Sequence, residues 1–232
     1  MSMKDINFVF FHVGEITYPS LLVKTIQKFH PTSKIYCVTD FKTEYIEGVF
    51  KTLRIDSNIK KLMTARLLGF SKLKLNEPAI YIDTDVLLTK KIPKKLFENH
   101  DVYLCSISHY KNVKFNNEHL RKLNLPEYFN KNIGDIYPFI ACFTYTKDYK
   151  FWLDCYTVLK EMDKKYHFWY GDQEAIKRIH ERNLYNIGYL EEKIVCNLPE
   201  YCTVIDESYS LHFRGPRKKD MIKFSNLILN DN

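Results

Sequence analysis

Two carboxylates separated by a single residue interrupt the most apolar stretch of the sequence. Asp83 and Asp85, with Thr84 between them, lie inside the run 79–88, whose other residues are apolar or aromatic. As one buried strand, this run would place both carboxylates on the same face, because side chains two apart project to the same side. Two buried carboxylates repel each other and lose hydration unless a cation lies between them. The pair therefore predicts a divalent metal, and oxygen ligands favour Mg²⁺ or Mn²⁺.

Two other interpretations of the pair were weighed against a metal site. Both carboxylates could form turn hydrogen bonds at a strand end. Phosphatases of the haloacid dehalogenase type also place an Asp-x-Asp at a strand end, but on their first strand and followed two residues later by Thr or Val. Here Leu87 occupies that position, and the strand lies well inside the chain. A metal site is therefore favoured.

The composition is that of one large globular domain with an anionic partner. Hydrophobic residues make up 45% of the 232 residues and charged ones 27%, and the net charge is +7. We expect one domain over residues 1–232, with 214–232 forming a basic, amphipathic C-terminal tail. A nucleotide diphosphate, an acidic lipid and a nucleic acid would all suit the charge. Nucleic acid is discounted, because no nucleic-acid-binding motif accompanies the basic residues.

The cysteines and the N-terminus indicate a cytoplasmic protein. No CxxC pair occurs, and most of the cysteines lie in apolar runs, so buried free thiols in a reducing compartment are expected. The first residues lack the order of a signal peptide, and no run reaches the roughly 20 apolar residues of a membrane span. The six cysteines are Cys37, Cys105, Cys142, Cys155, Cys196 and Cys202.

Apolar runs alternate with stretches of helical periodicity along the chain. Strands are expected at 6–13, 33–39, 49–55, 79–88, 102–106, 136–146, 184–198, 204–206 and 210–213, and helices at 20–29, 62–75, 93–99, 149–162, 171–182 and the C-terminus. A polar excursion containing a helix is expected at 111–132. The alternation predicts an α/β fold with a Rossmann-like, mostly parallel sheet flanked by helices. Its ligand site should lie outside the carboxyl ends of the strands, where Asp40 and the Asp83/Asp85 pair occur.

Several local features of the helices follow from the same patterns. Ser20 is predicted to cap the first helix. The apolar side of helix 62–75 is expected to comprise Leu62, Ala65, Leu68 and Leu73. The chain is expected to end in a helix that contains the apolar residues Met221, Phe224, Leu227 and Ile228.

Two motifs resemble those of known glycosyltransferases. The segment YIDTDVLL at 81–88 resembles the Asp-x-Asp motif of the GT-A glycosyltransferases. Far downstream, HFRGPRK at 212–218 has the His-x-x-Gly-x-x-Lys spacing of glycosyltransferase family 8, which includes bacterial lipopolysaccharide galactosyl- and glucosyltransferases and glycogenin. The resemblance implies a GT-A fold, a nucleotide-sugar donor, and Mn²⁺ or Mg²⁺ bridging the donor diphosphate.

Carried over residue by residue, the resemblance assigns roles on the donor side. Asp83, Asp85 and His212 would be the metal ligands, although His212 alone could be a strand-end histidine with its hydrogen bonds satisfied. The loop after the first strand would cradle the nucleoside base. An arginine on a helix is by itself usually a solvated side chain, but here Arg66 would face the donor. The implied donor-binding set is Val13, Gly14, Glu15, Tyr18, Asp40, Arg66, Asp83, Thr84, Gly215 and Lys218.

A third segment resembles the family's Asp-Gln-Asp sequence near the sugar. Asp172 and Gln173 match its first two residues, and Glu174 replaces the second Asp. Asp172 and Gln173 are therefore the predicted catalytic residues. Gln173 is too weak a base to accept a proton, so it would position the sugar or stabilise its oxocarbenium-like state. Alternatively, Asp172 caps a helix that begins after Gly171.

Two departures concern the acceptor side of the resemblance. Residues 137–142 replace the family's Asn-Ser-Gly segment, and residues 218–220 replace its Lys-Pro-Trp ending. The acceptor, the subfamily and the stereochemical outcome are open as a result.

The function predicted is metal-dependent transfer of a hexose from a nucleotide diphosphate sugar, with UDP expected. The acceptor would be a carbohydrate or glycolipid hydroxyl, and the resemblance favours retention at the anomeric carbon. A nucleotidyltransferase would need a Gly-rich, basic phosphate loop after the first strand, which residues 14–17 do not supply. A non-catalytic nucleotide-sugar-binding protein is the other alternative. The basic C-terminus could contact the inner face of an anionic membrane, or its lysines could be solvated on a core-packed helix.

Overall fold

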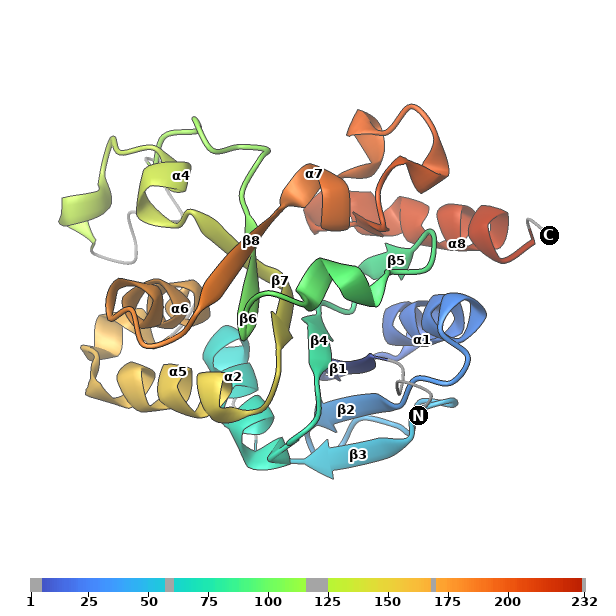
Figure 1. Cartoon of the computed structure of the whole chain (residues 1–232), viewed down its shortest axis with the longest axis horizontal. Helices are drawn as coiled ribbons and strands as arrows, with labels where there is room; N and C mark the ends of the chain where they lie inside the picture. Colours follow the sequence, from blue (N-terminus) through green and yellow to red (C-terminus); the bar gives the residue numbers. More distant parts are fainter. Residues whose placement is uncertain (1–5, 57–60, 116–124, 168–169, 231–232) are drawn as a thin grey trace.

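A seven-stranded sheet forms the centre of the computed structural model, which describes residues 6–56, 61–115, 125–167 and 170–230. The strand order is β3-β2-β1-β4-β7-β6-β8. Only β7 runs antiparallel to its neighbours. The predicted α/β fold with a mostly parallel sheet is thus confirmed (Figure 1). The strands are β1 (Asn7–Phe11), β2 (Ile35–Thr39), β3 (Lys51–Arg54), β4 (Ala79–Ile82), β6 (Val102–Ser106), β7 (Phe139–Thr146) and β8 (Ile187–Glu191).

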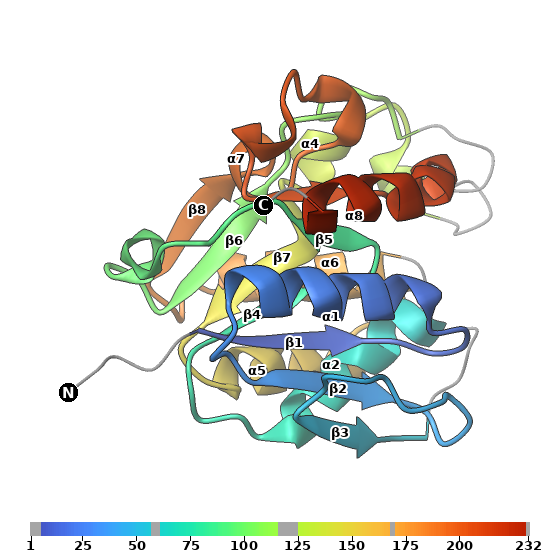
Figure 2. The same cartoon turned by 90° about the vertical axis from the view of Figure 1, so that its right-hand side faces the viewer.

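Helices cover both faces of this sheet (Figure 2). The helices α2 (Leu62–Leu73), α5 (Lys150–Glu161) and α6 (Gly171–Glu181) pack together on one face, while α1 (Thr17–Phe29) covers the other. Because successive strand side chains alternate, Val9 of β1 faces α2 and α5, and its neighbour Phe8 faces α1. The apolar strands are therefore buried on both faces, as expected for a mostly parallel sheet.

The first helix begins earlier than the sequence suggested. It starts at Thr17, whose backbone N–H and hydroxyl both donate hydrogen bonds to the carboxylate of Glu15, at 2.8 and 2.5 Å. Ser20 lies inside the first turn and donates its hydroxyl to the carbonyl of Ile16 at 2.6 Å. The prediction of Ser20 as the cap is therefore wrong, because the acidic side chain of Glu15 satisfies the helix start instead.

The buried side of α2 also differs from the prediction. Arg66, Leu67 and Phe70 are buried, whereas Leu62 and Leu68 are only partly buried. This helix packs against the sheet and against both α5 and α6, so it has no single apolar stripe. Periodicity alone could not locate its buried side.

The Asp83/Asp85 segment is a break between two strands, so the prediction of one continuous strand is wrong. The run 79–88 divides into β4 in the main sheet and β5 (Val86–Leu88), with a turn between them. In a second, two-stranded sheet, β5 pairs antiparallel with β9 (Ser210–His212). Val86 lies opposite His212 in that pairing. The turn determines the positions of the two carboxylates, and the pairing of β5 with β9 brings His212 beside them.

The C-terminal segment packs against the first helix. A 3₁₀ segment, Gly215–Asp220, leads into α8 (Met221–Asn230), which contacts α1. The ammonium group of Lys28 donates to the carbonyl of Ile228 at 2.7 Å. Met221 and Ile228 are buried, whereas Leu227 is 46% exposed.

The remaining elements are short helices and 3₁₀ turns between the longer elements. The predicted strand 204–206 is wrong, because Ile205–Glu207 is a 3₁₀ turn. Part of the excursion 111–132 lies outside the described residues. All six cysteines are free thiols, and all but Cys202 are buried, as predicted. No helix within the described ranges has the length and apolar character to cross a bilayer. The short helices are α4 (Ile133–Ile136) and α7 (Glu192–Val195), with 3₁₀ turns at Lys94–Phe97, Pro126–Tyr128, Lys164–Tyr166 and Pro199–Tyr201.

Candidate active site

A cleft of about 630 Å³ opens at the carboxyl edge of the sheet. Its walls come from the ends of β1 and β4, the start of β7, the helices α2 and α6, and the segment after β9. This is where a ligand site is expected in an open α/β sheet. The predicted site residues that line the cleft are Val13, Tyr18, Arg66, Asp83, Thr84, Asp85, Asp172, Gln173, His212, Gly215 and Lys218.

Three predicted metal ligands converge in the cleft. Nε2 of His212 lies 3.3 Å from Oδ1 of Asp85 and 3.9 Å from Oδ2 of Asp83. One ligand atom from each of the three residues lies within 4.8 Å of the other two. Nζ of Lys218 lies 3.0 Å from Oδ2 of Asp85. Two carboxylates and an imidazole form a donor set that suits Mn²⁺ or Mg²⁺, so the residues present fit such an ion.

Burial and charge shift the pKa values of these groups. Burial raises the pKa of Asp83, against the opposing charge of Arg66. Burial would also raise the pKa of Asp85, but hydrogen bonds and charges from His212 and Lys218 outweigh it and lower that pKa. Burial lowers the pKa of His212, while Cys142 and Asp85 raise it to a net value of about 10. The metal-free site therefore holds a protonated imidazole at neutral pH.

Arg66 joins the carboxylate turn to helix α6. Its guanidinium donates to Oδ1 of Asp83 at 2.7 Å and also pairs with Asp172. Asp172 is 1% exposed and accepts the N–H of Gln173 at 2.8 Å. The helix N-cap is Tyr170, so Asp172 lies within the first turn and the capping alternative for Asp172 is wrong. Arg66 thus holds a buried carboxylate beside the cleft.

Glu174, which replaces an Asp of the resembled motif, faces away from the cleft. It is buried and accepts hydrogen bonds from the hydroxyl of Tyr128 and from Nε of Arg178, both at 2.9 Å. These bonds hold α6 in place, so the departure from the motif at this position does not alter the lining of the cleft.

Three predicted donor-binding residues do not line the cleft. Asp40 accepts hydrogen bonds from the backbone N–H and hydroxyl of Thr43, at 2.7 and 2.6 Å. The hydroxyl oxygen of Thr43 accepts the N–H of Gly14 at 2.9 Å. Through Thr43, Asp40 therefore stabilises the loop after β1 at Gly14, the second of the three residues. The third, Glu15, is exposed and caps α1. Their proposed contacts with the donor would be indirect.

The cleft also contains residues that were not predicted from the sequence. His12 donates from Nε2 to the carbonyl of Glu15 at 2.6 Å, and burial lowers its pKa. His12 could have been predicted as a site residue, because it lies at the carboxyl end of the first strand. Tyr170 has a left-handed φ of 69° and stacks on Tyr137, with ring centroids 5.3 Å apart. The others are Phe11, Leu62, Met63, Ile140, Ala141, Cys142 and Arg214.

Several solved structures with a similar fold are glycosyltransferases. The bifunctional glycosyltransferase WbbM matches with a TM-score of 0.58 and 12% identity, over 99% of this chain and 50% of that chain. The galactosyltransferase LgtC, solved in complex with donor and acceptor sugar analogs, matches with a TM-score of 0.54 and 13% identity, over 96% of each chain. GlyE of Streptococcus pneumoniae matches with a TM-score of 0.60 and 12% identity, over 98% of this chain and 63% of that chain.

These likenesses establish the fold of the chain as that of the GT-A glycosyltransferases, as the sequence motifs implied. The chain spans half of the WbbM chain and less than two thirds of the GlyE chain, but nearly all of LgtC. Comparison of the sequence with protein-family models and with curated proteins finds no match.

Proposed function

We propose that this protein is a metal-dependent glycosyltransferase that moves a hexose from a nucleotide diphosphate sugar to a carbohydrate or glycolipid hydroxyl. One observation carries the proposal. Asp83, Asp85, His212 and Lys218, which come from two distant segments, meet in a single cleft at the carboxyl edge of the sheet. The fold shared with LgtC, which was solved with donor and acceptor sugar analogs, supports the same conclusion.

The diphosphate would lie between the acidic turn and the segment after β9. Asp83, Asp85 and His212 would hold Mn²⁺ or Mg²⁺, and the bound ion would neutralise charge on the departing nucleoside diphosphate. In the metal-free site, the ammonium group of Lys218 pairs with the carboxylate of Asp85. With the donor bound, it would pair with the phosphate oxygens instead. Gly215 has a left-handed φ of 65° and open space where a side chain would lie, so phosphate could approach its backbone.

The nucleoside would occupy the side of the cleft formed by the end of β1. Val13 and Tyr18 line that side together with Phe11 and His12. Their apolar and aromatic surfaces suit a base and ribose, and the sequence resemblance favours uracil. Gly14, Glu15 and Asp40 would act indirectly, by fixing the loop that carries Val13.

The sugar would face α2 and α6. Arg66 fixes Asp172 in a buried position. The carboxylate is therefore already oriented to accept hydrogen bonds from sugar hydroxyls. Gln173 lines the cleft next to it. As a neutral amide it cannot take a proton, so it would position the sugar or stabilise positive charge on the anomeric carbon. Retention of configuration is proposed on the strength of the resemblance alone.

The nucleotidyltransferase alternative is less well supported. In such an enzyme, the loop after β1 would offer free donors to phosphate, but here the N–H of Gly14 donates to Thr43 and Glu15 accepts from Thr17. A non-catalytic binding protein would use the same donor-binding residues, so donor hydrolysis separates it from an enzyme.

Donor hydrolysis tests the proposal directly. The protein would be incubated with Mn²⁺ and panels of UDP-, GDP- and CDP-sugars, and the released nucleoside diphosphate would be measured by chromatography. We expect release from UDP-sugars that stops with EDTA and falls at least about 100-fold in Asp85→Asn. Asp206→Asn removes an exposed carboxylate elsewhere and should keep full activity. Formation of a nucleotide sugar and pyrophosphate from UTP and a sugar phosphate would instead establish a nucleotidyltransferase.

A further inference from the structure

The two ring nitrogens of His212 face different surroundings. Nε2 faces the carboxylates of Asp83 and Asp85. Nδ1 is buried and has no nitrogen or oxygen hydrogen-bond partner among the described residues. A buried N–H without an acceptor costs about 1–3 kcal/mol. Metal-binding histidines almost always donate their second N–H to an acceptor, which fixes the tautomer and the ring orientation.

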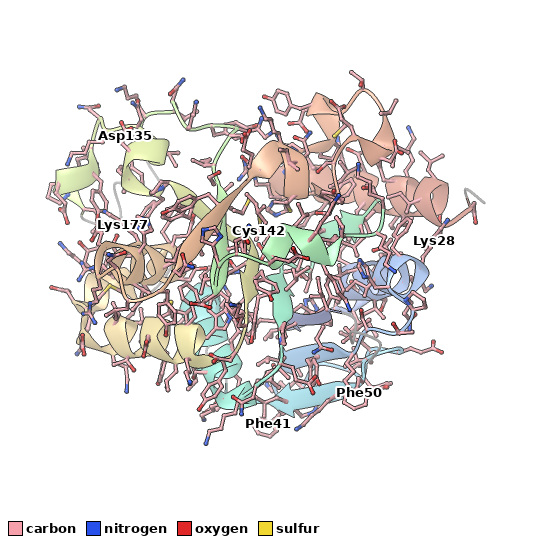
Figure 3. All side chains as sticks on the ribbon, in the orientation of Figure 1. Lys28, Phe41, Phe50, Asp135, Cys142 and Lys177 are labelled. Carbon is pink, nitrogen blue, oxygen red and sulfur yellow. The ribbon has the colours of Figure 1, made fainter. Side chains whose placement is uncertain are left out.

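Sulfur atoms occupy the space on the other side of this imidazole. A ring nitrogen of His212 and the sulfurs of Cys142 and Cys196 lie within 4.8 Å of one another, and all three residues are buried. Since Nε2 faces the carboxylates, Nδ1 is the nitrogen available to the sulfurs. Cys142 lies in the interior of the molecule, on β7 (Figure 3). Its carbonyl also accepts the N–H of Asp83 at 3.0 Å, so the same residue anchors the acidic turn.

Of the two sulfurs, that of Cys142 is the better candidate acceptor. Cys142 interacts with the imidazole and raises the pKa of His212. Its carbonyl also holds the acidic turn, so its sulfur lies beside the residues that would bind the metal.

We propose that Cys142 is a positioning residue, whose sulfur accepts the Nδ1–H of His212 and so aims the Nε2 lone pair at the metal pocket. The inference rests on the proposed metal-dependent function. It assigns a role to a buried group that the reaction itself does not use.

Titration of Mn²⁺ in the presence of UDP, followed by the electron paramagnetic resonance signal of free Mn²⁺, tests the proposal without an activity assay. Cys142→Ala should weaken Mn²⁺ binding by about 10- to 100-fold, the usual effect of losing such a partner. Cys142→Ser keeps an acceptor and should bind Mn²⁺ nearly as well as the wild type. Cys155→Ala removes an equally buried thiol, from α5, and should leave Mn²⁺ affinity unchanged.

The hydrogen bond also has a spectroscopic signature. Nitrogen-15 correlation spectra of the Mg²⁺-loaded protein should show the Nδ1–H proton of His212 shifted further downfield in the wild type and in Cys142→Ser than in Cys142→Ala. Wild-type affinity in Cys142→Ala, or equal losses in the Ala and Ser variants, would overturn the inference while leaving the proposed function intact. No Mn²⁺ binding by the wild type would overturn both. Stoichiometric zinc in the purified wild type, absent from Cys142→Ala, would also overturn it, because the sulfurs would then be metal ligands.

Discussion

At the scale of single residues, the buried charge of Asp172 depends on Arg66. Asp172 is 1% exposed, and Arg66 is its cationic partner among the described residues. Arg66→Met would leave that carboxylate buried without a counter-charge, which typically costs about 3–5 kcal/mol. We expect a loss of this size in the free energy of unfolding, measured by urea denaturation.

An exposed arginine provides the matched control for that change. Arg182 pairs with Glu161, and both side chains are about half exposed. Exposed pairs contribute about 0–1 kcal/mol, so Arg182→Met should hardly change stability. Equal losses in the two variants would show that the Arg66–Asp172 pair contributes no more than a surface pair.

The protonation of His212 predicts how metal binding responds to pH. Its pKa of about 10 in the metal-free site means that the imidazole carries a proton at pH 7, which a metal ion must displace. Raising the pH towards 10 removes that cost, so affinity should rise by up to about tenfold per pH unit. Burial raises the pKa of Asp83, and any proton held there would act in the same direction.

Calorimetry in buffers of different ionisation enthalpy measures the protons released when Mg²⁺ binds with UDP. We expect at least one proton per ion from the wild type, and less release from His212→Gln. Metal affinity that is independent of pH across the neutral range would contradict a protonated His212 in the metal-free site.

At the scale of elements, the start of α6 determines where Asp172 and Gln173 lie. A Cβ at Gly171 would collide with the carbonyl oxygen of Tyr166 and with the side chain of Thr64. Gly171→Ala must therefore shift the first turn of the helix, at a cost of about 1–3 kcal/mol. We expect sugar transfer to fall much more than Mn²⁺-dependent UDP affinity, because the displaced residues face the sugar.

Gly188 in β8 offers a comparison away from the cleft, with a milder clash that involves side chains only. A Cβ there would collide with the side chains of Tyr103 and His100. Gly188→Ala should therefore lower thermal stability but retain transfer at temperatures where the protein is folded. If Gly171→Ala behaves in the same way as Gly188→Ala, the start of α6 does not position the sugar.

Most elements could be predicted from the sequence, and the errors have physical causes. Apolar runs bounded by polar residues located the strands of the main sheet. The break between β4 and β5 gave no signal apart from the acidic residues themselves, because the flanking runs are equally apolar and contain no Gly or Pro. Helix α2 contacts several elements, so its periodicity was uninformative. The cap by Glu15 requires a side chain one residue outside the usual position.

At the scale of the whole molecule, the site depends on pairings that only distant segments can make. The resemblance identified Asp83, Asp85, His212 and Lys218, and the structure brings them together. The indirect position of Asp40 was not predictable, because it depends on a local hydrogen bond to Thr43 that leaves no periodic pattern. Cys142 could have been noticed, since it ends the segment that replaces a family motif.

The predicted membrane contact also belongs to the scale of the whole molecule. On α8, Ile222 is 51% and Leu227 is 46% exposed, and Lys223 and the preceding Lys219 are exposed too. We expect weak, salt-sensitive sedimentation with vesicles that contain an anionic phospholipid. The double substitution of Ile222→Glu and Lys223→Glu should abolish it. Equal binding to neutral vesicles, or none to anionic ones, would contradict the prediction.

The most direct test of the central claim is calorimetric titration of UDP into the protein with Mn²⁺ or with EDTA. We expect UDP to bind in the presence of Mn²⁺ and to lose nearly all affinity in EDTA or in Asp85→Asn, while Asp206→Asn binds like the wild type. UDP binding of equal strength in EDTA, or by Asp85→Asn, would show that no metal bridges the carboxylate turn to the diphosphate.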